Sequence, residues 1–191
     1  MWIINLKNLL LMEKSVSPAK SGIVFGVLFG VIMVLEFVIM YIIGIESLIK
    51  SSAKNIVDVA NYLVLPILFI YLGCNNYKIK INNGFISLSE SLKIGVSICL
   101  IAAIVYATFN VIFNLIFPEF ADEIIAILKR SMIAENPNMN SEQIEMGLYV
   151  VRKIMNPFVA FPITLAMFSF IGLIYSLIIG AIVKKENPQS I

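Results

Sequence analysis

The sequence predicts an all-α membrane protein with four transmembrane helices and an extracytoplasmic helical hairpin between the third and the fourth. Three observations support this prediction. Of the 191 residues, 60% are hydrophobic and only 14% are charged, whereas a soluble domain carries about 25% charged residues. Four segments stay apolar over the roughly 20 residues that a helix needs to cross a bilayer. A longer polar stretch with helical periodicity separates the last two of them.

Residues 1–20 are expected to form a cytoplasmic N-terminal tail. The opening MWIINLKNLLL has one lysine and no small-residue cleavage site, so it lacks the features of a signal peptide. Two interpretations remain open. This stretch is either a short interfacial helix anchored by Trp2, or it is not translated because translation starts at Met12. We favour the second interpretation.

The four-helix transmembrane domain is expected over residues 21–185. Its spans are roughly Gly22 to Gly44, Ile56 to Cys74, Leu92 to Phe117 and Phe158 to Val183. Pro66 lies inside the second span and Pro162 inside the fourth. We expect kinks rather than breaks at both prolines, because neighbouring groups can satisfy the freed carbonyls.

The connection between the second and third spans contains two local signals. Asn82-Asn83-Gly84 predicts a turn, and the lysines that alternate with Ile79 and Ile81 indicate a short strand or hairpin before it. Further on, Ser87 is followed three residues later by Glu90, which is the spacing of a capping box. The third helix is therefore expected to begin near Leu88.

Residues 118–156 are expected to form the outer helical hairpin. Pro118 suits the first position of a helix, ENPNMN interrupts the periodicity, and a second helix is expected to start at Asn140 or Ser141. The apolar face of the first helix is Phe120, Ile124, Ile127, Leu128 and Met132, and that of the second is Ile144, Leu148, Val151 and Met155. An amphipathic pair lying on the membrane surface is the alternative. Residues 186–191 form the C-terminal tail.

Lysine and arginine are divided unevenly between the two sides that four spans would define. Of the 14 Lys and Arg residues, eight lie in the two tails and in the connection between the second and third spans, and six lie on the opposite side. Since basic residues favour the cytoplasmic side of a membrane, we expect both termini to be cytoplasmic.

Several classes of function are excluded or disfavoured by composition. The chain has no histidine, which removes the commonest general base and the commonest metal ligand. No glycine-rich phosphate loop is present, so we expect no enzyme, no cofactor and no metal. Cys74 and Cys99 form no CxxC pair and are expected to be small buried hydrophobes. A net charge of +2 without a basic patch gives no reason to expect a nucleic-acid partner.

Small residues recur every four positions in two of the spans. One stripe lies on the first span and the other on the fourth: Gly22, Gly26 and Gly30, and Gly172, Ser176 and Gly180. Such stripes allow two helix backbones to approach closely. We therefore expect spans one and four to touch, and a homodimer interface is the alternative.

A carboxylate interrupts the first span in GVLFGVIMVLEFVIM, where it is Glu36. An ionisable side chain near the bilayer centre costs at least roughly 2.5–3.5 kcal/mol and marks a candidate functional site. Because Glu36 lies at the edge of the glycine stripe, we expect it to face protein. The hydrogen-bond partners expected at comparable depth are Thr108, Asn110 and Thr164. Asp58 and Asn61 are expected at the wet interface, without a special role.

Several short motifs follow one another in a fixed order along the chain. They are SGIVFGVLFG, YKIKINNGFISLSESLKIG, SEQIE, NPF and GLIYSLIIGAIVKK. With these motifs, the chain from Met12 to its C-terminus resembles a bacterial family known as domain of unknown function 4199. The resemblance implies a four-span integral membrane protein with no assigned activity, and it offers no catalytic residue to transfer. We expect the protein to lie in the bacterial cytoplasmic membrane.

Two functions remain open. The first is a non-enzymatic accessory or interaction protein, in which the hairpin and the small-residue stripes are contact surfaces and a protonated Glu36 fixes the register of the helices. The second is a small proton-coupled transporter or channel, in which Glu36 exchanges a proton. The expected partners are the lipid bilayer and either a second copy or another membrane protein.

Overall fold

The computed structural model describes residues 16–44, 46 and 53–187. In these residues all continuous secondary structure is helical, and four helices are long and apolar enough to cross a membrane. They cover Ile23–Ile43 (α3), Asn55–Ile81, Leu88–Ile116 (α7) and Pro157–Val183 (α10). The all-α fold with four such helices is confirmed. The expectations for Trp2 and Met12 fall outside the described residues.

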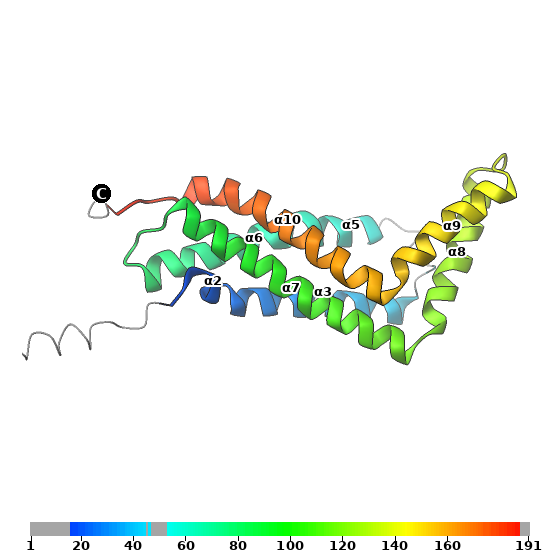
Figure 1. Ribbon diagram of the computed structural model, residues 1–191, viewed down its shortest axis with the longest axis horizontal. Coiled ribbons are helices and arrows are strands. Elements are labelled where there is room, and N and C mark those ends of the chain that lie inside the picture. The colour runs from blue at the N-terminus through cyan, green and yellow to red at the C-terminus, as the bar shows by residue number, and fades with distance from the viewer. Residues whose placement is uncertain (1–15, 45, 47–52, 188–191) are drawn as a thin grey trace, which may run out of the picture.

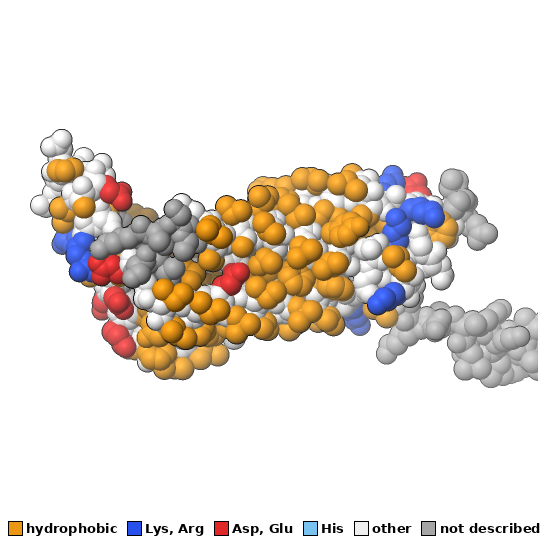
Figure 2. Space-filling model, turned by 180° about the vertical axis from the view of Figure 1, so that it is seen from behind, with side chains coloured by type: hydrophobic (Ala, Val, Ile, Leu, Met, Phe, Trp, Pro, Cys, Tyr) orange, Lys and Arg blue, Asp and Glu red, His pale blue; other side chains and the backbone are white. Residues whose placement is uncertain are grey.

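The long helices run side by side along one axis, and a short helix, α2 (Pro18–Ser21), precedes α3 (Figure 1). Hydrophobic side chains cover most of the middle of the face in Figure 2, where an acidic patch interrupts them, while the other charged side chains gather toward its two ends. Ile42 and Ile182 are about three-quarters exposed, at 77% and 75%. Such a surface suits lipid, and it would be costly in water.

The second span is interrupted by π-helical turns. It consists of α5 (Ala53–Val59), η1 (Ala60–Val64), α6 (Leu65–Asn76) and η2 (Tyr77–Ile81). Pro66 has no N–H to donate to the carbonyl of Tyr62, four residues earlier. The Tyr175 hydroxyl on α10 donates to that carbonyl at 2.9 Å. The proline therefore leaves the span continuous, as expected, because a neighbouring helix satisfies the freed acceptor.

The strand expected at Ile79 and Ile81 is wrong, because both residues lie in η2. The Lys78 ammonium reaches the Val183 carbonyl at the end of α10, at 2.8 Å, and this contact holds the segment against the bundle. The predicted turn follows, with positive φ at Asn83 (50°) and Gly84 (87°). Extended pairing occurs later instead, where Ile86 and Lys185 exchange two backbone hydrogen bonds of 2.9 Å.

The capping box at the start of α7 is confirmed. The Ser87 hydroxyl accepts from the Glu90 N–H at 3.2 Å, and the Glu90 carboxylate accepts from the Ser87 N–H at 2.8 Å. Pro162 lies inside α10, and this helix also continues through its proline.

The two small-residue stripes do not face each other, which corrects the expected contact between them. Both pack against α7, because α7 lies between α3 and α10 and carries small residues of its own. A Cβ on Gly26 or Gly30 would meet the backbone or side chains of Ile98, Ile101, Ala102 and Val105, and one on Gly172 or Gly180 would meet Ser91, Gly95, Val96 and Cys99. Helices α3 and α10 meet through Phe29 and Phe168, whose ring centres are 6.0 Å apart.

Helices α8 (Glu119–Glu135) and α9 (Ser141–Met155) project from the end of the bundle opposite the C-terminal residues (Figure 1). Pro118 occupies the N-cap position just before Glu119 and not the expected first position of α8, whereas α9 begins at Ser141, as expected. Between the two helices lies a small apolar cluster formed by Ile125, Ile144 and Leu148 together with Leu128, Met132, Met139, Val151 and Met155. This cluster contains the predicted face of α9. On α8 it contains Leu128 and Met132 of the predicted face and Ile125 in place of Ile124, while Phe120 and Ile127 are buried outside it.

A surface ion pair also joins α8 and α9. The Lys129 ammonium lies 2.7 Å from the Glu145 carboxylate, and its hydrogen bond and its positive charge lower the pKa of that carboxyl group. Both side chains are exposed to solvent, so water and salt screen the attraction and the pair contributes little to stability.

The close packing of α7 against α10 can be tested by replacing Gly95 with a larger residue. The Cβ of Gly95→Ala would overlap the Ser176 side chain, so the helices would have to separate. We expect the free energy of unfolding in bicelles to fall by about 1–3 kcal/mol, the usual cost of overpacking. Gly147→Ala on α9 is the control, because its Cβ would meet only the flexible end of Met132. An equal loss in both variants would contradict this account.

Candidate functional site

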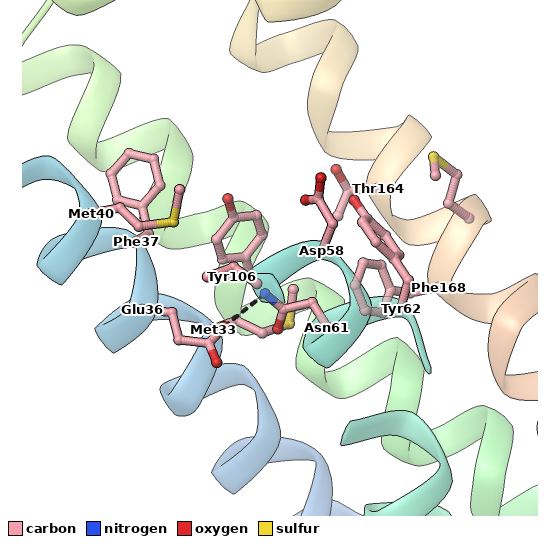
Figure 3. Close-up of a pocket in the computed structure, with 12 residues that line it drawn as sticks. Met33, Glu36, Phe37, Met40, Asp58, Asn61, Tyr62, Tyr106, Thr164 and Phe168 are labelled. Atoms are coloured by element: carbon pink, nitrogen blue, oxygen red, sulfur yellow. Dashed lines mark hydrogen bonds between the residues drawn. The ribbon is translucent and has the colours of Figure 1, made fainter. Parts of the chain in front are cut away.

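Glu36 lies in the second half of α3 and is half-buried. Its carboxylate accepts a hydrogen bond of 2.7 Å from the side-chain amide of Asn61, which η1 carries (Figure 3). The expectation that Glu36 faces protein agrees with this contact. The same contact contradicts the expectation that Asn61 lies at the wet interface without a role.

Asn61 reaches Glu36 because the two residues lie at the same depth in their spans. The second helix already includes Ala53, three residues before the predicted start, so Asn61 lies further inside the span. At 1.5 Å per residue, Asn61 is about 12 Å along the helix from Ala53, and Glu36 is about 10 Å from the end of α3. Consecutive antiparallel spans therefore place the amide and the carboxylate at the same level.

The pair borders a cavity of about 190 Å³ to which all four spans contribute. Its polar lining comes from Glu36, Asp58, Asn61, Tyr62, Tyr106 and Thr164, and the labelled side chains converge on it in Figure 3. Its apolar lining comes from Met33, Phe37, Met40, Val57, Met167 and Phe168. A liquid water molecule occupies about 30 Å³, so the cavity has room for several.

One oxygen in this site lacks a partner. The side-chain oxygen of Asn61 is buried, and among the described residues it is the only buried side-chain oxygen or nitrogen without a hydrogen bond. Leaving a buried acceptor unpaired costs about 1–3 kcal/mol. A carboxylate cannot supply the missing donor, whereas a protonated carboxyl group or a water molecule can.

The three expected partners of Glu36 are placed differently from one another. Thr164 lines the cavity. Thr108 is exposed on another face of α7, because two residues correspond to about 200° around a helix and Thr108 cannot share the face of Tyr106. Asn110 faces a second cavity, and its side-chain oxygen accepts from the Asn114 amide at 3.0 Å. The prediction of Thr108 and Asn110 as direct partners is therefore wrong.

The second cavity has a volume of about 240 Å³. It is lined by α7 and α10 and by the adjoining ends of α8 and α9, and it shares Tyr106 and Thr164 with the first cavity. No lysine or arginine is among the described residues that line either cavity. In the described part of the chain, no group of three or more His, Cys, Asp or Glu residues could hold a metal ion.

Together, the fold and the site suggest a small multi-pass membrane protein with a cavity that all four spans border and that polar side chains partly line. The chain belongs to the family described as Protein of unknown function (DUF4199), whose model matches residues 24–185. The matched region includes all four spans and the residues around Glu36. No curated protein and no solved structure matches the chain.

The contact between Glu36 and Asn61 predicts a measurable coupling. In a double-mutant cycle with Glu36→Leu and Asn61→Leu, we expect a coupling free energy of about 0.6 to 1.7 kcal/mol, from the average to the largest value for hydrogen bonds between transmembrane helices. Unfolding in bicelles would measure it. A parallel cycle with Glu36→Leu and Thr108→Val should give no coupling. Equal values in the two cycles would show that the hydrogen bond carries no specific energy.

Proposed function

We propose that this protein is a small, non-enzymatic proton-coupled transporter or channel in which Glu36 binds the proton. The observation that carries the proposal is the polar cavity at Glu36, to which every span contributes a side chain. Placing a carboxyl group at this depth in a membrane span costs free energy. A purely structural role for it would not require a cavity with room for water.

The contact with Asn61 indicates how protonation would act. A neutral Glu36 presents an O–H to the unpaired amide oxygen of Asn61, so that two hydrogen bonds join α3 to η1. Loss of the proton removes this donor and leaves a negative charge in the cavity. Because η1 is a π-helical turn, a geometry frequent at functional sites, it is the segment on which this change would act first.

The proposal includes an orientation in the membrane. Lys78, Lys80, Lys93, Lys184 and Lys185 belong to elements at the end of the bundle where the C-terminal residues lie (Figure 1). Their excess favours the cytoplasmic side. Both termini are then cytoplasmic, α8 and α9 form an extracytoplasmic hairpin, and the membrane is the bacterial cytoplasmic membrane.

An infrared pH titration of the protein in lipid tests the role of Glu36. We expect a carboxyl band that is absent from Glu36→Gln and whose intensity changes with bulk pH. In proteoliposomes with an internal pH indicator, we expect Glu36→Gln to abolish protein-dependent proton uptake. Glu142→Gln, at an exposed carboxylate on α9, should leave uptake unchanged. A Glu36 band that is constant at every accessible pH would refute the proposal.

The α9 surface supports a second candidate, a non-enzymatic accessory or interaction protein. Four apolar side chains on α9 are about half exposed or more: Met146, Tyr149, Val150 and Ile154. They recur at helical spacing on the side away from the cluster shared with α8. An unpartnered apolar face of this kind suits a second copy of the chain or another membrane protein.

A cysteine at the centre of this face tests for a homodimer. If two copies pair through α9, Val150→Cys should give a disulfide-linked dimer in oxidised membranes, and Ala126→Cys on the exposed side of α8 should not. The native Cys74 and Cys99 are buried, so they do not interfere. Equal cross-linking of both variants, or of neither, would argue against pairing through α9.

A further inference from the structure

The two halves of the bundle differ in how their polar side chains are satisfied. In the half near the C-terminal residues, the buried Ser91 and Ser176 donate to carbonyls of their own helices, each at 3.1 Å. These serines therefore need no water. In the other half, polar side chains from several helices line two cavities.

The two cavities lie next to each other along the bundle. Tyr106 and Thr164 border both of them. From this shared wall, the second cavity extends to Phe120, Met155 and Pro157, where α8 and α9 join the membrane-spanning helices. The cavities therefore form a series that begins at the α8–α9 end and ends at Glu36.

The lining of the second cavity includes, beside seven apolar residues, four side chains that can form hydrogen bonds with water: Tyr106, Asn110, Asn114 and Thr164. Asn110 and Asn114 lie within the last two turns of α7 and place two amides on one face. The Asn114 amide donates to both the backbone and the side-chain oxygen of Asn110, at 2.8 and 3.0 Å. Placing an amide side chain in hydrocarbon costs free energy, and this cost is much smaller where the amide lies beside water.

The opposite side of Glu36 is closed by aromatic and aliphatic packing. Phe29 stacks on Phe69 with ring centres 5.5 Å apart and contacts Phe168 at 6.0 Å. Beyond these rings lies a layer of fully buried side chains: Ile70, Cys74, Ile94, Ile98 and Cys99. Water is excluded from close-packed apolar layers of this kind.

We infer that the second cavity is a water-filled access route that connects Glu36 to the α8–α9 side of the membrane only. The inference rests on the proposed proton-binding role and deepens it, because it names the side from which the proton arrives. The Phe29–Phe69–Phe168 layer separates Glu36 from the other side. Release of a proton to that side requires these rings to part.

Cysteine accessibility in sealed vesicles tests the route. The probe is a membrane-impermeant, cationic methanethiosulfonate, and the readout is the mass of the full-length protein. Asn110→Cys should react from the side on which Glu142→Cys on α9 reacts, and not from the other side. Its rate should exceed that of Thr108→Cys on the order of tenfold or more, because the reactive thiolate forms beside water and not in lipid.

The controls separate the route from general permeability. Thr108 lies two residues away on the same helix but is exposed on its lipid-facing side. Ser176→Cys, in the packed half, should react from neither side, and neither should the native cysteines. Asn114→Cys provides a second position in the route should Asn110→Cys not fold.

The labelling outcomes test the access route independently of the proposed role of Glu36. Equal rates at residues 108 and 110, or reaction of residue 110 from the opposite side, would overturn the access route whatever Glu36 does. Labelling of residue 110 from the α8–α9 side supports the route, even if the infrared titration shows that Glu36 holds its proton at every pH.

Discussion

The close approach of α3 and α10 to α7 is the contact on which the rest of this structure depends. Lipid provides no hydrophobic force to bring helices together, so association relies on fitted surfaces. Here the fit comes from small residues on both partners, such as Gly26 against the backbone at Ile98 and Gly172 against the backbone at Gly95. Because α7 is contacted from two sides, it sets the positions of the other helices.

Pro66 has a second effect on the architecture. The span that contains it is not a regular α-helix throughout: its π-helical turn carries Asn61, which contacts Glu36, and Tyr175 satisfies the carbonyl that Pro66 leaves free. The spans pack around fully buried side chains in one half of their length and border two cavities with polar side chains in the other half. A polar site and a stable bundle coexist because they occupy different levels of the same helices.

Much of the fold could be predicted from local sequence signals. The spans, the turn at Asn83 and Gly84, and the capping box of Ser87 depend on residues close together in the chain, and hydropathy and spacing report them directly. The site could be predicted only in part. Glu36 stood out by its charge, but Asn61 became its partner through an earlier helix start and a π-helical turn, which have no simple sequence pattern. The stripes indicated close packing without identifying α7 as the partner, because small-residue spacing does not say which helix lies opposite.

The end of the bundle that carries Lys78 and Lys185 is fastened in several ways. The Lys78 ammonium binds the last turn of α10, and the backbones at Ile86 and Lys185 pair across the chain. The opposite end is held by aromatic side chains: Phe37 and Tyr41 of α3 pack against Phe113 of α7 and Phe120 of α8, with ring centres 4.9 to 5.8 Å apart. Between these two attached ends, Glu36 meets Asn61 beside a cavity. A change in the contact between Glu36 and Asn61 would then act on η1 within a bundle that is held at both ends.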